Sequence, residues 1–100
     1  MNELKKYIER IRALCENNRV KSLYLFGSFA KGNSNDQSDI DFIVELLDTD
    51  PIEYADHYFN LKDELKSLLK RQIDLLEKKA IKNPYLLNHI EQSKVAIYAK

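Results

Sequence analysis

The first segment of the chain is predicted to be an amphipathic helix. Between residues 3 and 17, apolar side chains return every third or fourth position, which is the spacing of one buried stripe on a helix. These positions are Leu4, Tyr7, Ile8, Ile11, Leu14 and Cys15. Asn17 and Asn18 follow the stripe and are predicted to end the helix.

Four shorter segments have the composition of strands. Runs rich in β-branched and aromatic residues cover positions 20–26 and 39–46, and a polar loop at 33–38 separates them. A third, shorter strand is predicted at 72–77. The apolar segment at 95–98 is either a last strand or an apolar docking tail.

Two further helices are predicted from their start signals. Asp50 can cap a helix in which Pro51 takes the first position and Glu53 completes a variant of the capping box. Apolar positions then keep helical spacing to about residue 70, with Lys62 as the exception. They are Ile52, Ala55, Phe59, Leu65, Leu68 and Leu69. Asn83-Pro84 is predicted to start the last helix, which runs through Ile90.

This order of elements predicts an α+β fold, a small mixed β-sheet with helices packed on one face. The length of 100 residues indicates a single domain over 1–100. Sixteen basic and sixteen acidic residues cancel, which argues against stable nucleic-acid binding. No apolar stretch approaches the roughly 20 residues that span a bilayer. With one cysteine and no signal-peptide pattern, the protein is expected to be cytoplasmic.

Two carboxylates stand one residue apart at the start of the second strand. The side-chain period of two puts Asp39 and Asp41 on one face and Ile40, Phe42 and Val44 on the other. Adjacent anions repel and raise each other's pKa unless a cation joins them. A hard divalent cation with oxygen ligands satisfies this need, so the pattern predicts a magnesium site. The alternative is a pair of solvated strand residues.

Two more features can complete such a site. Gly27-Ser28 follows the first strand, where free backbone N–H groups can bind phosphate, although such a sequence is usually only a turn. Asp74 stands among apolar residues of the third strand and either faces solvent or joins a charged site. If the second and third strands are neighbours, Asp74 lies beside Asp41. The three carboxylates can then hold two metal ions.

Together these segments resemble the minimal nucleotidyltransferases of the DNA polymerase beta-like superfamily, which are often paired as antitoxins with a HEPN-domain toxin. The resemblance covers most of the chain, and its motifs are Gly27-Ser28, Asp39-Ile40-Asp41 and the later Asp74. It implies the polymerase-beta-like fold. It also implies that Gly27 and Ser28 contact the triphosphate and that Asp39 and Asp41 bind both Mg²⁺ ions. Asp74 would hold the catalytic ion and help to activate the attacking hydroxyl.

The resemblance further implies the reaction. A nucleoside monophosphate, AMP from ATP, moves to a protein hydroxyl, a tyrosine of the cognate HEPN toxin, and this AMPylation makes the chain an antitoxin. The alternatives are a non-catalytic antitoxin that neutralises the toxin by binding, and a small-molecule nucleotidyltransferase. A homodimer or a hetero-oligomer with the toxin is compatible with either. Lys31 replaces the Arg of many members, which leaves its role open.

Other candidate residues are better explained by structure. Cys15 lies on the apolar stripe, which favours a buried structural thiol. His57 and His89 have no defined partners, so surface or packing roles are expected. Glu45 shares the face of the carboxylates and is either an exposed strand residue or a supporting residue of the site.

The aromatic residues of the second long helix favour packing as well. Tyr54, Tyr58 and Phe59 fit helix packing better than a base-stacking platform, although one of them can contact a partner.

Overall fold

A computed structural model describes residues 2–27 and 39–99, with the side chains from position 4 onward in the first segment. Its helices are α1 (Asn2–Lys5), α2 (Ile8–Asn17), α4 (Pro51–Leu69) and α5 (Pro84–Ser93), with a short 3₁₀ turn η1 (Lys78–Ala80). Its strands are β1 (Val20–Phe26), β2 (Ile40–Leu46), β3 (Ile73–Glu77) and β4 (Val95–Ala99). The polar loop predicted at 33–38 lies outside the described residues.

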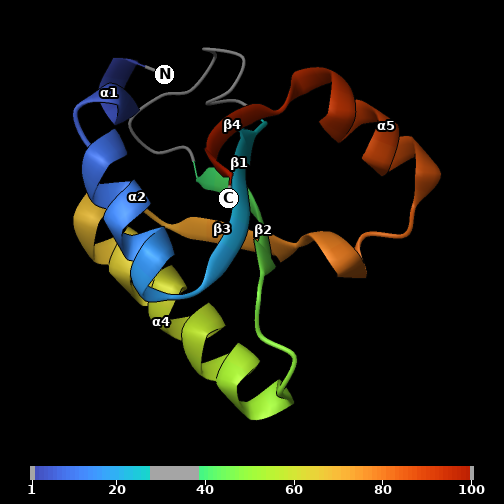
Figure 1. Ribbon diagram of the computed structural model, residues 1–100. Coiled ribbons are helices and arrows are strands. Elements are labelled where there is room, and N and C mark those ends of the chain that lie inside the picture. Colours follow the sequence, from blue (N-terminus) through green and yellow to red (C-terminus); the bar gives the residue numbers. More distant parts are fainter. Residues whose placement is uncertain (1, 28–38, 100) are drawn as a thin grey trace.

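The four strands form one mixed sheet in the order β3-β2-β1-β4 (Figure 1). β1 runs antiparallel to both β2 and β4, whereas β2 and β3 are parallel. Helix α4 connects the two parallel strands, as a parallel pair requires a crossover. The four predicted strands are therefore confirmed, and the segment at 95–98 pairs with β1 as a strand.

The main core lies between one face of the sheet and helices α2 and α4. Alternate residues of β2 point into it, and Ile40, Phe42 and Val44 are almost fully buried, as the predicted alternation requires. Figure 1 shows α2 and α4 on one side of the sheet and α5 on the other. On the α5 side, Ile43 and Ile90 line a small cavity. The predicted fold, a small mixed sheet with helices packed on one face, is confirmed, and the helix predicted from Asn83-Pro84 is α5, which lies on the other face (Figure 1). No described helix is both long and apolar enough to cross a membrane.

The predicted helix over residues 3–17 is interrupted once. A turn at Lys6 and Tyr7 separates α1 from α2, and the N–H of Tyr7 donates to the carbonyl of Leu4 at 2.9 Å. The apolar stripe continues across the turn, with Leu4, Ile11 and Cys15 buried. The stripe prediction is thus confirmed, while the single continuous helix is not.

Helix α4 begins at the predicted residues. The Asp50 side chain accepts a hydrogen bond from the N–H of Ile52 at 2.8 Å, and Pro51 occupies the first helical turn. Lys70 ends the helix in the left-handed conformation, with φ at 56°. The start of α4 therefore follows from local signals in the sequence, whereas its end places a lysine in a conformation that glycine or asparagine usually adopts.

The apolar stripe predicted for α4 was wrong in its first half. Ile52 and Phe59 are exposed, at 74% and 61%. The residues that pack against the sheet are Tyr54, Tyr58, Leu61, Leu65, Leu68 and Leu69. Both sets have helical spacing, and the tyrosines cover the sheet with their apolar rings while their hydroxyls find polar partners. The two apolar residues on the other stripe are left facing outward.

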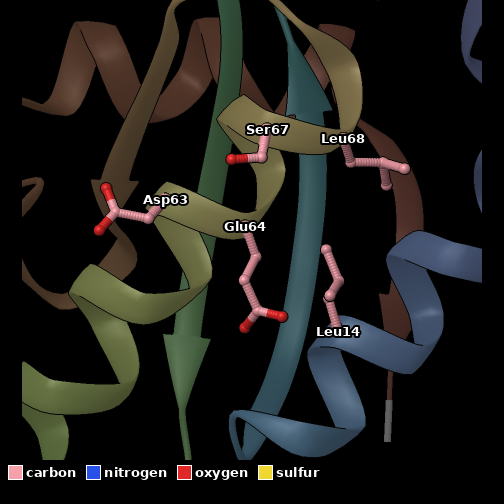
Figure 2. A pocket seen from close by; sticks show the side chains of 5 residues that line it. All are labelled: Leu14, Asp63, Glu64, Ser67 and Leu68. Carbon is pink, nitrogen blue, oxygen red and sulfur yellow. The ribbon is translucent and has the colours of Figure 1, made fainter.

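A buried polar network joins α2 to α4. The Asn18 amide nitrogen donates to the Leu14 carbonyl at 2.8 Å and to Glu64 Oε1 at 2.9 Å. The Asn18 oxygen accepts a hydrogen bond from Asn60 at 2.7 Å. Leu14, Glu64 and Leu68 line an open surface pocket of about 400 Å³, and Figure 2 shows Leu14 of α2 pointing toward these residues of α4. Asn18 therefore links the two helices that cover the sheet.

A second cluster fixes the start of α4 to the sheet. The buried carboxylate of Asp48 lies 2.8 Å from His57 Nδ1 and 3.0 Å from Arg19 Nε. The Arg19 contact is an ion pair without the alignment of a hydrogen bond. The expectation that His57 has no defined partner is therefore wrong, because its ring nitrogen bonds to Asp48 of the loop after β2, although its role is structural.

Asn18→Ala is expected to lower the free energy of unfolding by about 1–3 kcal/mol, because it removes a buried side chain together with its hydrogen bonds to the Leu14 carbonyl, Glu64 and Asn60. Urea denaturation followed by circular dichroism measures the change. Asn17→Ala, at an exposed neighbouring position, is the control and should change stability by less than about 0.5 kcal/mol. Equal losses in both variants would show that the network does not stabilise the fold.

Candidate active site

Two of the three predicted carboxylates lie directly opposite each other. In the parallel pairing of β2 with β3, Asp41 is in register with Asp74. Both point to the face of the sheet opposite the main core, because Ile40, Phe42, Ile73 and Leu75 beside them point into that core. Neighbouring strands lie about 4.8 Å apart, so the two carboxyl groups are within reach of each other. The predicted juxtaposition is confirmed.

The carboxylates perturb one another electrostatically. Partial burial raises the pKa of Asp41 above its ordinary value of 3.8. The negative charges of Asp74 and then Asp39 raise this pKa further, and so does a side-chain hydrogen bond with Asp74. Asp39 is exposed immediately before β2, and its effect on Asp41 makes it part of the same electrostatic cluster. The arrangement concentrates negative charge at one point of the sheet.

Gly27 is required by two features of its position. Its φ is +78°, a conformation that residues with a Cβ rarely adopt. A Cβ built on Gly27 would lie 2.5 Å from Asp41 Oδ2, closer than atoms can approach without a shift. The preceding residue, Phe26, pairs with Asp41 in the antiparallel register of β1 and β2. The turn after β1 is therefore held directly against the carboxylate cluster.

The donor set of this cluster fits a magnesium ion. Carboxylate oxygens are the ligands that hard divalent cations prefer, and excess negative charge is what such a cation neutralises. Within residues 2–27 and 39–99, no three acidic, His or Cys side chains already surround a common cation position. Metal binding by Asp39, Asp41 and Asp74 therefore stays a prediction. The predicted phosphate contacts of Ser28 and any role of Lys31 fall on residues outside the described ranges.

Glu45 points to the same face as Asp41 but is tied to basic residues. Lys21 and Lys78 each place an Nζ atom 3.9 Å from one of its carboxylate oxygens. Ile43 stands between Glu45 and Asp41 along β2. Glu45 therefore has its own counter-charges, which separates it from the carboxylate cluster.

The Cys15 thiol and His89 take no part in this site. Cys15 is fully buried, and burial raises the pKa of its thiol to about 12, so it remains protonated at neutral pH. This confirms the expected structural thiol. His89 is exposed on α5, in agreement with the expected surface role.

Sequence reasoning missed that two tyrosines of α4 hold the edge of β3. The Tyr58 hydroxyl donates a hydrogen bond to the Leu75 carbonyl, next to Asp74. Tyr54 makes a side-chain hydrogen bond with Glu77, and burial, followed by the charge of Glu77, raises the pKa of both phenols. Their packing role was predicted correctly. Their contacts with β3 could have been anticipated, because the two tyrosines are four positions apart and therefore lie on one side of the helix that leads into β3.

The fold and this carboxylate face agree with the family resemblance of the sequence. The resemblance predicted a small mixed sheet with carboxylates aligned on neighbouring strands beside Gly27, and the structure brings these features together. The family model described as "Polymerase beta, Nucleotidyltransferase" matches residues 9–100. The chain belongs to this family, which confirms the family resemblance.

Known proteins of this family are similar over nearly the full chain. A protein of Methanocaldococcus jannaschii named "Putative protein adenylyltransferase" is 36% identical over 98 residues, covering 97% of both chains. A crystal structure described as a toxin-antitoxin with AMP-PNP matches with a TM-score of 0.72 and 26% identity, over 93% of this chain and 73% of that one.

A third match shows the fold alone. It is a tri-AMPylated Shewanella oneidensis HEPN toxin in complex with an MNT antitoxin, and its TM-score is 0.66 at 23% identity. The match covers 96% of this chain and 72% of that one.

Gly27→Ala is expected to destabilise the protein by about 1–3 kcal/mol through its positive φ and its contact with Asp41. A double-mutant cycle with Asp41→Ala separates the two causes. In the Asp41→Ala background the same change should cost less, because the clashing carboxylate is gone. Thermal or urea unfolding of the four proteins measures the coupling. Identical costs in both backgrounds would show that Gly27 serves only the backbone turn.

Asp41→Asn is expected to raise the melting temperature at pH 7 in EDTA. Because the folded-state pKa of Asp41 is raised above 3.8, its favourable contribution to folding is complete below that pH and lost as pH rises through the folded-state pKa. At pH 7 the ionised cluster therefore opposes folding, and the amide removes one charge from it.

The gain should shrink as the pH falls toward 3.8, and Mg²⁺ should raise the melting temperature of the wild type more than that of Asp41→Asn. Differential scanning fluorimetry measures both effects. Glu9→Gln, which alters a carboxylate side chain that is 90% exposed on α2, is the control. A wild type that Mg²⁺ leaves unchanged would contradict the cation site.

Proposed function

We propose that this chain is a magnesium-dependent protein adenylyltransferase. It moves AMP from ATP onto a hydroxyl of a partner protein, a tyrosine of a cognate HEPN toxin, and acts in this way as an antitoxin. The observation that carries this proposal is the alignment of Asp41 with Asp74 against the turn at Gly27. The alignment brings a concentrated negative charge and a candidate phosphate-binding turn to one point.

The roles proposed for the residues follow from their positions. Asp39 and Asp41 would hold two Mg²⁺ ions, and Asp74 would share the ion at the acceptor. When bound, these ions supply charge neutralisation on the triphosphate and a lowered pKa of the attacking hydroxyl. Asp74 is exposed beside Asp41 and can accept a hydrogen bond from that hydroxyl and help to take its proton. Gly27, without a Cβ, lets the turn backbone approach the triphosphate, and Ser28 is proposed to add a hydroxyl contact.

The similar proteins support the choice of donor and acceptor. The M. jannaschii relative is named for transfer of an adenylyl group to protein. AMP-PNP, an analogue of ATP, is present in the toxin-antitoxin structure, and the Shewanella complex pairs an MNT antitoxin with an AMPylated HEPN toxin. A formal net charge of zero suits a protein acceptor better than a polyanion.

A transfer assay tests the proposal. The purified chain, Mg²⁺ and each nucleoside triphosphate in turn are mixed with the HEPN-domain protein encoded beside it, and the partner is weighed by intact mass spectrometry. The partner should gain one or more AMP groups from ATP. Asp41→Asn should slow the transfer by about 100-fold or more, because a lost ligand weakens the charge stabilisation on which the step depends.

Glu9→Gln should transfer at the wild-type rate, since its side chain lies outside the carboxylate cluster. A tight complex whose partner gains no mass with any nucleotide would overturn the enzymatic proposal in favour of an antitoxin that acts by binding. An adduct that forms equally with Asp41→Asn would overturn the assignment of the site.

A further inference from the structure

Helix α4 presents an exposed apolar stripe to solvent. Ile52, Ala55 and Phe59 are spaced by three and four residues, so they lie on one side of the helix. Ile52 and Phe59 are among the most exposed large apolar side chains of the described residues. Contiguous exposed apolar surface marks interaction sites in soluble proteins, so this stripe needs an explanation beyond the stability of the monomer.

The stripe borders a groove between α4 and the edge strand β3. The groove has a volume of about 360 Å³ and is lined by Tyr54, Tyr58 and Phe59 of the helix and by Leu75, Leu76 and Glu77 of the strand. The rings of Tyr58 and Phe59 meet edge to face, with centroids 5.1 Å apart and planes at 88°. This contact fixes the Phe59 ring at the rim of the groove although it is mostly exposed.

The groove leads to the carboxylate cluster. Asp74 itself points to the face of the sheet away from α4, but Leu76, which also lines the groove, points to the same face as Asp74 and follows it by two residues. A segment that lies in the groove can therefore pass over the edge of β3 at Leu76 toward the proposed acceptor position. The other end of the same sheet face is occupied by α5, whose Lys94 lies 4.4 Å from the centre of the Tyr24 ring. The β3 edge is the open approach among the described residues.

The edge of β3 is not suited to strand addition at this point. The Gln72 carbonyl accepts a hydrogen bond from the Ile40 N–H across the sheet at 3.1 Å. Carbonyl directions alternate along a strand, so the Leu75 carbonyl faces away from β2, where the Tyr58 hydroxyl already donates to it. A partner is therefore received through side chains in the groove and not by backbone pairing with Leu75.

Acidic residues surround the exposed stripe. Asp56 follows Ile52 by four positions and Asp63 follows Phe59 by four, so both lie beside the stripe on α4. Asp74 and Glu77 add negative charge along β3. Lys79, over the ring of Tyr54 at 3.8 Å, and Lys62, three positions after Phe59, offset part of this charge. The surface as a whole is apolar with an acidic border, which is complementary to an apolar segment that carries Lys or Arg.

We propose that the α4–β3 groove docks the acceptor protein. Its occupant is an apolar segment of that protein flanked by basic residues, which seats against Phe59 and Ile52 and brings the acceptor hydroxyl toward Asp74. This inference rests on the proposed function for the identity of the partner. It assigns the recognition of the protein acceptor to a surface separate from the carboxylates that carry out the transfer.

The test introduces a positive charge at each of two matched exposed aromatic residues. Phe59→Lys changes the groove, whereas Tyr85→Lys changes a side chain that is 86% exposed on α5. Isothermal titration with the HEPN-domain protein encoded beside this chain, in Mg²⁺ and AMP-PNP, measures the Kd, and the transfer assay measures KM for the partner. Phe59→Lys should raise both by at least 10-fold. Tyr85→Lys should leave them within about 2-fold of wild type, and the affinity of AMP-PNP alone should be unchanged in both.

The outcomes separate this inference from the proposed function. Transfer by the wild type with equal partner affinity in both variants overturns the groove and leaves the enzyme. Binding that depends on Phe59 without any transfer supports the groove and overturns the enzyme, whereas a wild type that neither binds nor transfers overturns both. The double reversal Asp56→Lys/Asp63→Lys should also raise the Kd about 10-fold. An unchanged Kd there overturns the basic character assigned to the partner.

Discussion

The parallel register of β2 and β3 is the constraint on which the rest of the structure depends. It is fixed by apolar residues that point into the core, so that pairing Ile40 with Ile73 and Phe42 with Leu75 necessarily sets Asp41 against Asp74. A slip of β3 by one residue would turn Asp74 into the core and the apolar residues of β3 outward. The same packing that stabilises the sheet therefore also holds two like charges together, at an electrostatic cost that a bound cation can remove.

The backbone at Gly27 packs closely against Asp41. Gly27 follows the residue that pairs with Asp41, and the absence of a side chain there is what allows the turn and the carboxylate to occupy adjacent space. Tyr58 holds β3 from its free edge through the Leu75 carbonyl. Three elements from distant parts of the chain thus converge on the neighbourhood of one aspartate, while α2 and α4 provide the support beneath.

The features that local chemistry determines could be predicted from the sequence. Period-two alternation predicted the face of Asp41, and Asp50-Pro51 predicted the start of α4. The orientation of α4 could not be predicted, because Ile52 and Tyr54 begin two stripes of equal helical spacing, and only the packed sheet decides which is buried. The same holds for Asp48, whose partners His57 and Arg19 come together only in the folded chain. The groove beside Phe59 went unpredicted for that reason.

The crossover through α4 also has a consequence for biosynthesis. Asp41 leaves the ribosome together with the β1–β2 pair, but Asp74 emerges only after the whole of α4. A nascent chain can therefore form the antiparallel pair early and still lack its second carboxylate, because closing the parallel pair is a long-range event that is intrinsically slow. Assembly of the carboxylate pair is in this way tied to completion of the fold, and a truncated product that ends before β3 would carry Asp41 without Asp74.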